Sequence, residues 1–227
     1  GLSMASPAQH RPHLRLLPAE PEESPRSREQ TPVSRSLRSY ADLQDAELVA
    51  LGIQGNRQAL EWLYRRHAAF AIHLAIRIEG SAREADDIVH DSFVRAFERL
   101  REIRDPGAFR SWLGSIVVRE VRTHMRRARL MRAIGLIRAG DPIDLDAIAS
   151  PDASPSTRAQ IAQLYALLQT LPVDDRIAWI LRSVEGHDHD TIVRMTSCSL
   201  ATVKRRIDRA QSYLDEHFVD SQASENF

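Results

Sequence analysis

The spacing of apolar residues constrains this chain more than any other feature. Over two long blocks, apolar side chains recur three and four positions apart, which is the period of one face of an α-helix, and neither block shows the strict alternation of a strand. The first block spans residues 40–132 and the second residues 158–218. This pattern predicts an all-α protein of two small helical domains, each large enough to bury a modest core.

Three segments outside these blocks lack the helical period. Residues 1–39 are rich in Pro, Ser, Arg and Glu and carry too few apolar residues to offset the entropy of ordering, so we predict a disordered N-terminal tail. Residues 133–157 include "GDPIDLDAIASPDASPST", whose Gly, Pro and acidic residues predict a flexible linker between the two domains. Residues 219–227 are a short C-terminal tail.

The charge balance excludes a uniformly basic surface. The chain has 31 basic and 31 acidic residues, so binding to nucleic acid depends on where the basic residues cluster. Its one cysteine, Cys198, excludes an intramolecular disulfide and a zinc site built of cysteines, and is typical of a reducing compartment. No apolar run reaches the roughly 18 residues of a membrane span, and the N-terminus shows no secretory signal. We therefore expect a cytoplasmic protein without membrane insertion and without a cofactor.

The first block divides into helices whose outer faces are charged. Asp45 is expected to cap the first of them, Asn56 to begin the second and Ser81 to cap the third. On the third helix, "SAREADDIVHDSFVRAFERL", side chains that could bind a metal lie three and four positions apart: Asp86, Asp87, His90 and Asp91. A solvated acidic face explains the same pattern without a metal, and we favour that interpretation.

Arginine is concentrated in the last helix of the first block, "AFRSWLGSIVVREVRTHMRRARLMR". Its apolar positions, which include Phe109 and Trp112, predict a face packed on the core. Six arginines lie between Arg119 and Arg132, against the one acidic residue Glu120. A run this one-sided in a neutral chain is typical of contact with the phosphate backbone of a nucleic acid, and a merely solvated helix face is the alternative.

The second block carries the pattern of a helix-turn-helix. Pro172 ends its first helix, Asp188 or Asp190 is expected to cap a short third helix, and Ser199 is expected to cap a basic fourth helix after the turn "TSCS". The core-facing side of the fourth helix consists of Val203, Ile207, Ala210 and Leu214. The opposite side carries Arg205, Asp208, Arg209 and Ser212, with Thr202 and Arg206 on its flanks. We interpret this helix as the reader of a DNA major groove, where guanidinium groups recognise guanine and a carboxylate accepts from cytosine.

Four stretches, in this order, resemble hallmarks of the extracytoplasmic-function sigma factors, the small two-domain members of the bacterial sigma-70 class. They are "DIVHDSFVRAFERL", "FRSWLGSIVVREVRTHMRR", "LPVDDR" and "CSLATVKRRIDRAQ". The resemblance covers about Asp42 to Glu216, with residues 40–132 corresponding to sigma domain 2 and residues 158–218 to sigma domain 4. It implies a factor that is not an enzyme, that directs core RNA polymerase to promoter DNA, and that has an anti-sigma factor as a partner.

The resemblance also implies a role for each surface. Polymerase binding is expected at Asp86, Asp87, His90, Asp91 and Arg95. Opening and reading of the minus-10 promoter element is expected at Arg104, Phe109, Trp112, Arg119, Arg122, Arg126 and Arg127. Reading of the minus-35 element is expected at Thr202, Lys204, Arg205, Arg206, Asp208 and Arg209. The chain departs from the family pattern at His90-Asp91, where relatives carry Gln-Glu, and at Arg119, where they carry Asn, so promoter preference does not transfer from relatives.

Two other classes of function remain as alternatives. A stand-alone helix-turn-helix transcriptional regulator would use the first domain to dimerise or to sense a ligand, but the sequence shows no additional apolar stripe for a dimer face. A metal-dependent hydrolase would use "HDHD", His187, Asp188, His189 and Asp190, as ligands. Adjacent side chains on a helix point apart, so we disfavour this second alternative.

Overall fold

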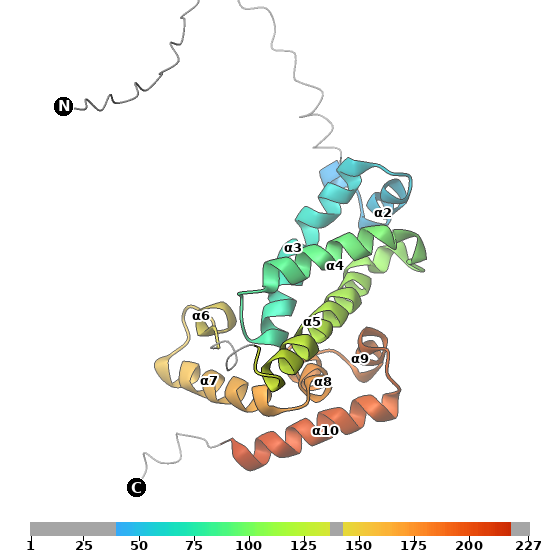
Figure 1. Ribbon diagram of the computed structural model, residues 1–227. Helices are drawn as coiled ribbons and strands as arrows, with labels where there is room; N and C mark the ends of the chain where they lie inside the picture. The colour runs from blue at the N-terminus through green and yellow to red at the C-terminus, as the bar shows by residue number, and fades with distance from the viewer. Residues whose placement is uncertain (1–39, 137–142, 219–227) are drawn as a thin grey trace, which may run out of the picture.

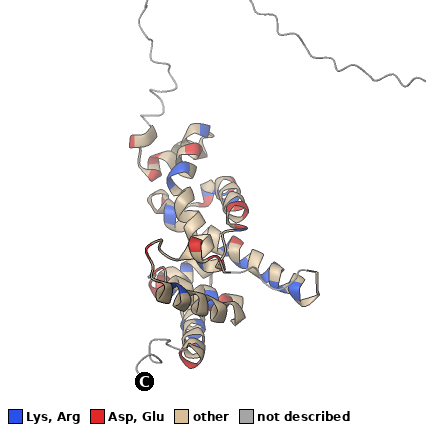
Figure 2. Cartoon of the chain, turned by 90° about the vertical axis from the view of Figure 1, so that its left-hand side faces the viewer, with Lys and Arg blue, Asp and Glu red and all other residues tan. Residues whose placement is uncertain are grey.

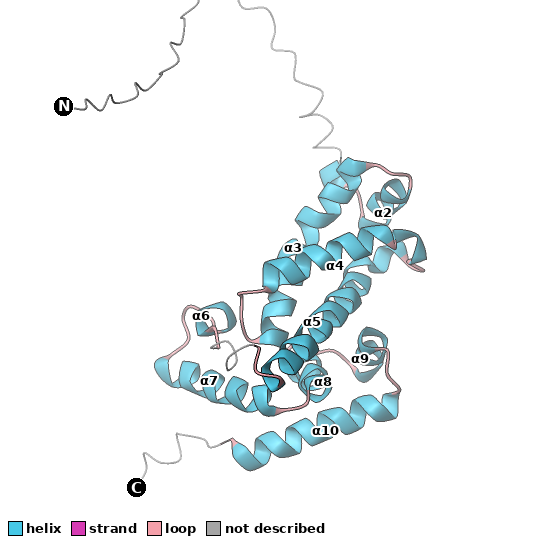
Figure 3. Ribbon diagram, viewed as in Figure 1, coloured by secondary structure: helices cyan, strands magenta, loops and turns pink. Residues whose placement is uncertain are grey.

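The computed structural model describes residues 40–136 and 143–218, and these residues form helices and loops without a strand (Figures 1 and 3). The predicted all-α fold class is confirmed for this part of the chain. The predicted tails, residues 1–39 and 219–227, lie outside the described residues. None of the described helices is both long and apolar enough to cross a membrane.

The first group of helices corresponds to the first sequence block. It consists of α2 (Asp45–Ile53), α3 (Arg57–Glu79), α4 (Ala85–Glu98) and α5 (Phe109–Ala133), with two short 3-10 turns, η1 (Leu100–Glu102) and η2 (Pro106–Ala108), between α4 and α5. The apolar faces of α3, α4 and α5 pack on one another, where Leu63, Phe93 and Leu113 are buried. The inward faces are those that the helical period predicted.

Only some of these helices begin at the residues that the capping pattern of the sequence predicted. The second helix begins next to Asn56, close to the predicted start, and Asn56 is its cap, since its side chain accepts a hydrogen bond from the backbone N–H three residues on, at 3.1 Å. The prediction for Asp45 was wrong: it is the first residue of α2, and Gln44 precedes it with its N–H bonded to the Glu47 carboxylate at 2.7 Å. Asp45 instead turns its carboxylate towards α3. Ser81 was also wrong as a cap, because its hydroxyl bonds a loop amide and α4 begins four residues later.

The second group contains the predicted helix-turn-helix. Its helices are α7 (Pro155–Thr170), α8 (Val173–Ser183), α9 (His189–Thr196) and α10 (Leu200–His217), and α10 runs along the lower edge of the molecule in Figure 1. Asp188, not Asp190, caps α9, and Ser199 caps α10 as predicted; each accepts from the backbone N–H three residues on, at 2.7 and 3.2 Å. Between the two helices Ser197 has a φ of 55°, which turns the chain sharply.

The predicted flexible linker, residues 133–157, differs from the structure over part of its length. A single helical turn, α6 (Leu145–Ile148), forms inside it with Asp144 as its cap, and α7 already begins at Pro155. The N–H of Asp144 donates to the carbonyl of Gly80 at 3.0 Å, which attaches this segment to the end of α3. One helical turn is too short to show an apolar period, so composition alone predicted a linker. Residues 137–142 lie outside the described residues.

The two groups of helices pack against each other, with α5 contacting α8 and α9 (Figure 1). Buried side chains of both groups form one connected hydrophobic cluster, so the two expected cores are joined. Gly80 ends α3 with a φ of +79°, and a Cβ built there would stand 3.0 Å from the ring of Tyr165 on α7. The Tyr165 hydroxyl donates to the carbonyl of Arg77 at 2.8 Å. The close approach of α7 to the end of α3 therefore depends on this glycine.

Candidate nucleic-acid interface

α10 presents the basic face expected of a helix that enters a DNA groove. Its apolar side is buried, and its other side exposes Lys204, Arg205 and Asp208. Neither Lys204 nor Arg205 forms an ion pair with the described residues, so both cations are available to a ligand. Thr202 is half-buried, with its hydroxyl 2.9 Å from the hydroxyl of Ser199. The N-terminal half of α10 is thus an exposed cationic surface on a helix that the turn holds in place.

Two arginines of α10 are tied to the start of α8. Arg206 lies 3.1 Å (Nη2) from Asp174 Oδ2 and also donates through Nη1 to the sulfur of Cys198 at 3.0 Å. Arg209 donates to Asp175 Oδ1 at 2.8 Å, and its side chain is still 58% exposed. Arg206 therefore faces the turn and α8 in this arrangement, whereas Arg209 lies at the edge of the exposed face.

The arginines of α5 divide into exposed and engaged ones. Arg119 and Arg127 are exposed and form no ion pair with the described residues. Arg122 Nε lies 2.9 Å from Asp174 Oδ1, and Arg126 Nη2 lies 2.6 Å from Asp174 Oδ2. Two of the expected DNA contacts of α5 are therefore in contact with the second group of helices.

The remaining residues expected at the minus-10 element lie at or before the start of α5. Arg104 is exposed in the loop before η2, and Trp112 is half-buried. Phe109 has no exposed surface, and its ring packs 5.2 Å from the ring of His67 and 6.1 Å from that of Trp112, measured between ring centroids. In this structure Phe109 is a core residue that fixes the start of α5, which corrects its expected place on a DNA-facing surface.

Asp174 is the functional candidate that the sequence did not reveal. Its carboxylate receives guanidinium groups from α5 and from α10 and is only 17% exposed. Asp174 and Asp175 lie in the first turn of α8, where acidic side chains are favoured by the helix dipole and look like an ordinary start signal. No sequence period connects position 174 with Arg122 or Arg206, so only the tertiary structure shows the cluster.

The acidic face of α4 points to solvent. Its exposed residues include the predicted Asp86, Asp87, His90, Asp91 and Arg95, together with Val94 and Glu98. Arg95 Nε also lies 3.0 Å from Glu120 Oε1 on α5, so the two helices are joined at this surface. Among the described residues, no three His, Cys, Asp or Glu side chains gather in a way that could hold a metal ion. In "HDHD", Asp188 is engaged as the cap of α9.

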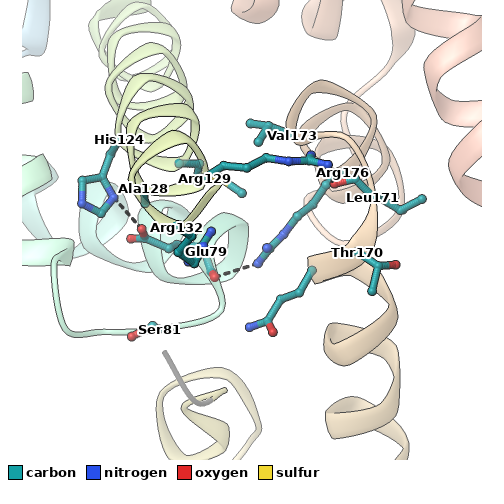
Figure 4. Close-up of a pocket in the computed structure, with 12 residues that line it drawn as sticks. Glu79, Ser81, His124, Ala128, Arg129, Arg132, Thr170, Leu171, Val173 and Arg176 are labelled. Atoms are coloured by element: carbon teal, nitrogen blue, oxygen red, sulfur yellow. Dashed lines mark hydrogen bonds and ion pairs between the residues drawn. The ribbon is translucent and has the colours of Figure 1, made fainter. Parts of the chain in front are cut away.

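A cleft of about 360 Å³ lies between the C-terminal half of α5, the end of α3 and the start of α8 (Figure 4). Arg176 is buried beside it and donates to the backbone carbonyl of Glu79 at 2.6 Å. Burial lowers the pKa of Arg176 to about 10, which leaves it charged at neutral pH. Arg129 donates to the carbonyl of Leu171 at 3.3 Å. These guanidinium groups bind carbonyls that helix ends leave without a partner, and they thereby join the two groups.

Acidic and basic residues are interspersed over the molecule (Figure 2), in line with the equal totals of the sequence. Positive surface is therefore local. It is formed by exposed side chains of α10, such as Lys204 and Arg205, and of α5, such as Arg119 and Arg127. Exposed guanidinium groups on helices suit the phosphates and base edges of a DNA duplex.

Two family models match the chain, one at each group of helices. Sigma-70 region 2 matches residues 63–131, which include α4 and nearly all of α5. Sigma-70, region 4 matches residues 161–211, which include α8, α9 and the first half of α10. The matches thus cover the acidic face, the arginine-rich helix and the helix-turn-helix.

Curated relatives and solved structures agree with these matches. The ECF RNA polymerase sigma factor SigM of Mycobacterium tuberculosis is 31% identical over 170 residues, which cover 75% of this chain and 82% of the relative. The RNA polymerase sigma-H factor of Pseudomonas aeruginosa is 27% identical over 189 residues, covering 76% and 93%.

Two solved structures share the fold. CnrH in complex with the cytosolic domain of CnrY is similar with a TM-score of 0.50 at 26% identity, covering 76% of this chain and 95% of CnrH. The sigma factor RpoE of Bartonella quintana, in complex with the anti-sigma factor NepR, is similar with a TM-score of 0.52 at 21% identity, covering 69% and 94%.

Proposed function

The chain belongs to the extracytoplasmic-function sigma factors of the sigma-70 class, and we propose that it directs core RNA polymerase to specific promoters through α5 and α10. The observation that carries this assignment of surfaces is the exposed basic face of α10, presented after a sharp turn in the part of the chain that matches region 4. A factor of this kind acts by binding, so we assign it no catalytic activity. Its place of action is the cytoplasm, where RNA polymerase works.

We propose that the exposed face of α4 binds core RNA polymerase. Its members are Asp86, Asp87, His90, Asp91 and Arg95. They lie within the segment that matches region 2, and the exposed carboxylates of Asp86, Asp87 and Asp91 suit a basic partner surface. The departure from the family at His90-Asp91 keeps polar groups at the same helical positions.

For the minus-10 element we propose contacts from the exposed residues at the start and along the outer face of α5. The exposed ones are Arg104, Arg119 and Arg127, with the half-buried Trp112 beside them, and Arg122 and Arg126 join when their contacts with Asp174 open. Phe109 contributes from the core by holding the start of α5. Guanidinium groups spread along one helix suit the sequence-independent part of DNA binding, which neutralises phosphates.

For the minus-35 element we propose that α10 enters the major groove. Lys204, Arg205 and Asp208 are the exposed candidates for base contacts, and Thr202 and Arg209 lie beside them. A guanidinium can bind guanine with two hydrogen bonds, and a carboxylate can accept from cytosine. Arg206 joins them only when its contact with Asp174 opens.

We also propose an anti-sigma factor as a partner. The CnrH structure, which shares this fold at 26% identity, was solved with the cytosolic domain of a second protein bound. Sequestration by a protein is one way to keep a transcription factor inactive until a signal arrives. Co-purification of the tagged chain from cells, followed by mass spectrometry, tests for such a partner.

Run-off transcription tests the proposed function. Core RNA polymerase is mixed with or without the protein, and genomic fragments serve as templates because the promoter sequence is unknown. We expect discrete transcripts from a small number of fragments only when the protein is present. The protein should also co-elute with core RNA polymerase in size-exclusion chromatography.

Size-exclusion chromatography, together with a DNA-protection assay on the protein alone, separates this function from that of a stand-alone regulator. A stand-alone regulator would fail to co-elute with core RNA polymerase and would protect a specific DNA site by itself as a dimer. Failure to co-elute would contradict the assignment of α4 as a polymerase-binding face, and protection of a DNA site by a dimer alone would support the rival.

A further inference from the structure

Asp174 lies where the two groups of helices meet, and it binds arginines from both. Its Oδ1 lies 2.9 Å from Arg122 Nε, and its Oδ2 lies 2.6 Å from Arg126 Nη2 and 3.1 Å from Arg206 Nη2. The carboxylate is 17% exposed and Arg206 only 16%, so solvent screens their pair less than a surface pair, whereas Arg126 is 55% exposed and its pair is screened more. We propose that Asp174 acts as a clasp. In the free protein it holds the two groups of helices against each other, an arrangement that we call the closed form, and it keeps these three arginines from binding DNA.

The inference rests on the proposed function of the arginines. Arg122 and Arg126 belong to the minus-10 surface and Arg206 to the helix of the minus-35 surface. A guanidinium group that is bonded to a carboxylate cannot at the same time form the same bonds with a phosphate or a base edge. Asp175, the next residue, holds Arg209 of α10 at 2.8 Å. Two neighbouring carboxylates therefore engage cations of both promoter surfaces.

Polar contacts on either side of the clasp hold the same closed arrangement. Arg77 on α3 forms an ion pair with Glu185, which follows α8, and the Nη2 to Oε2 distance of its second hydrogen bond is 2.9 Å. The buried Arg176 reaches from α8 to the end of α3. Arg122 adds a hydrogen bond of 3.4 Å to the carbonyl of Thr196 at the end of α9. The closed form is thus connected at several points along the contact between the groups.

Apolar packing is adapted to the closed form as well. A Cβ built on Gly114, in the middle of α5, would stand 3.3 Å from Met195 Cε on α9 and 3.4 Å from Phe70 Cζ on α3. Glycine inside a helix is less favourable than alanine, and the close approach of these side chains explains its presence here. Met195 is buried in the closed form and would meet water if the groups separated.

These contacts give the clasp a consequence for DNA binding. Only molecules whose clasp is open offer Arg122, Arg126 and Arg206 to DNA, so the apparent affinity of the free protein is reduced by the fraction that is open. Loss of the Asp174 carboxylate raises that fraction. A holoenzyme, in which core RNA polymerase holds the two groups by other surfaces, depends less on the clasp.

The test compares Asp174→Asn with Asp146→Asn in the full chain. Both changes remove one acidic charge from the first turn of a helix. Asp174→Asn removes ion pairs with three arginines, whereas Asp146→Asn removes one, with Arg158, which lies outside the proposed DNA surfaces. Fluorescence anisotropy measures the affinity of each free protein for the promoter fragment found by run-off transcription. We expect Asp174→Asn to bind DNA about five- to thirty-fold more tightly than wild type. This factor corresponds to a loss of about 1–2 kcal/mol in the free energy that favours the closed form over the open form. Asp146→Asn should change the affinity less than about twofold.

The conservative variant Asp174→Glu distinguishes loss of the carboxylate from damage to the fold. Asp174→Glu keeps the carboxylate and should stay near the wild-type affinity, whereas a variant that merely damages the fold should bind DNA less well. Small-angle X-ray scattering should show a larger radius of gyration for Asp174→Asn than for wild type. Equal DNA affinities of wild type and Asp174→Asn, whatever their scattering, would overturn the clasp.

Run-off transcription with the same variants separates the clasp from the function. If wild type and Asp174→Asn both support transcription while their free DNA affinities are equal, the clasp is wrong and the function stands. If neither supports transcription, the failure lies with the proposed function.

Discussion

Arg205 on α10 and Arg127 on α5 are both exposed, and neither forms an ion pair with the described residues. Their positions on the two helices predict different roles in DNA binding. Arg205 lies on the face that follows the helix-turn-helix turn, where a side chain can reach base edges, whereas Arg127 lies in a run of arginines along α5. We therefore expect the same chemical group to recognise bases at position 205 and to neutralise phosphates at position 127.

Arg205→Ala and Arg127→Ala test this division. In the holoenzyme, Arg205→Ala should weaken binding to the cognate minus-35 element by about 1–3 kcal/mol and relax the preference at one base position. Arg127→Ala should weaken binding to all promoter variants alike and reduce its salt dependence. Binding titrations on a set of minus-35 variants make the comparison, and equal, sequence-independent losses from both changes would mean that α10 only grips the backbone.

His124 connects α5 to the end of α3 through a carboxylate. Its Nδ1 lies 2.6 Å from Glu79 Oε1. This hydrogen bond raises the pKa of His124 above the ordinary value of 6.5, against the opposing effect of burial. Because the pKa is higher in the folded than in the unfolded chain, the contribution to stability is fully present below about pH 6.5 and is lost as the pH rises through the folded pKa.

His124→Gln should therefore lower the melting temperature more at about pH 6 than at about pH 8.5. The loss at the lower pH should be no more than about 1 kcal/mol, since His124 is partly exposed and solvent screens the pair. His73→Gln, an exposed histidine on α3, is the control and should change little at either pH. An equal loss for His124→Gln at both values would show that the charge on the imidazole does not matter.

At the scale of elements, the helical period predicted the inward faces of α3, α4, α5 and α10, because burial of an apolar stripe is a local property of the sequence. Caps were less predictable. Ser199 and Asn56 cap their helices, but Asp45 is drawn away by partners on α3. α6 was missed because a single turn carries no period. Local patterns fail where a distant residue competes for the same side chain.

Gly80 shows such a distant effect and yields a prediction. Gly80→Ala should lower the free energy of unfolding by about 1–2 kcal/mol for the left-handed backbone, and further because the added Cβ meets the ring of Tyr165. Gly55→Ala is a matched control, since Gly55 has a φ of +87° with no atom within 4 Å of its Cβ position. Urea denaturation measures both, and the excess loss at Gly80 reports the contact between α3 and α7. Equal losses would mean that this contact adds nothing to stability.

At the scale of the whole molecule, the sequence predicted two helical groups, and the family resemblance implied a role for each group. It did not predict how the two groups contact each other. In the sequence, Asp174 has the features of a residue at the start of a helix, and Arg206 lies on the flank of a basic helix face. No sequence pattern indicates that the two residues are in contact. The contact at 3.1 Å, together with those of Arg122 and Arg126, emerges only when α5, α8 and α10 are placed together. A composition rich in Pro and Gly predicted a flexible linker, whereas the structure docks part of it on α3.

The central claim is that this chain reads promoters as part of RNA polymerase. DNase footprinting tests it most directly, on a fragment that supports run-off transcription, with the protein alone, core RNA polymerase alone and the two together. The account predicts protection of two separate elements upstream of the start site only in the mixture, with little protection by the protein alone at the same concentration. A complete footprint by the protein alone, or none by the mixture, would contradict it.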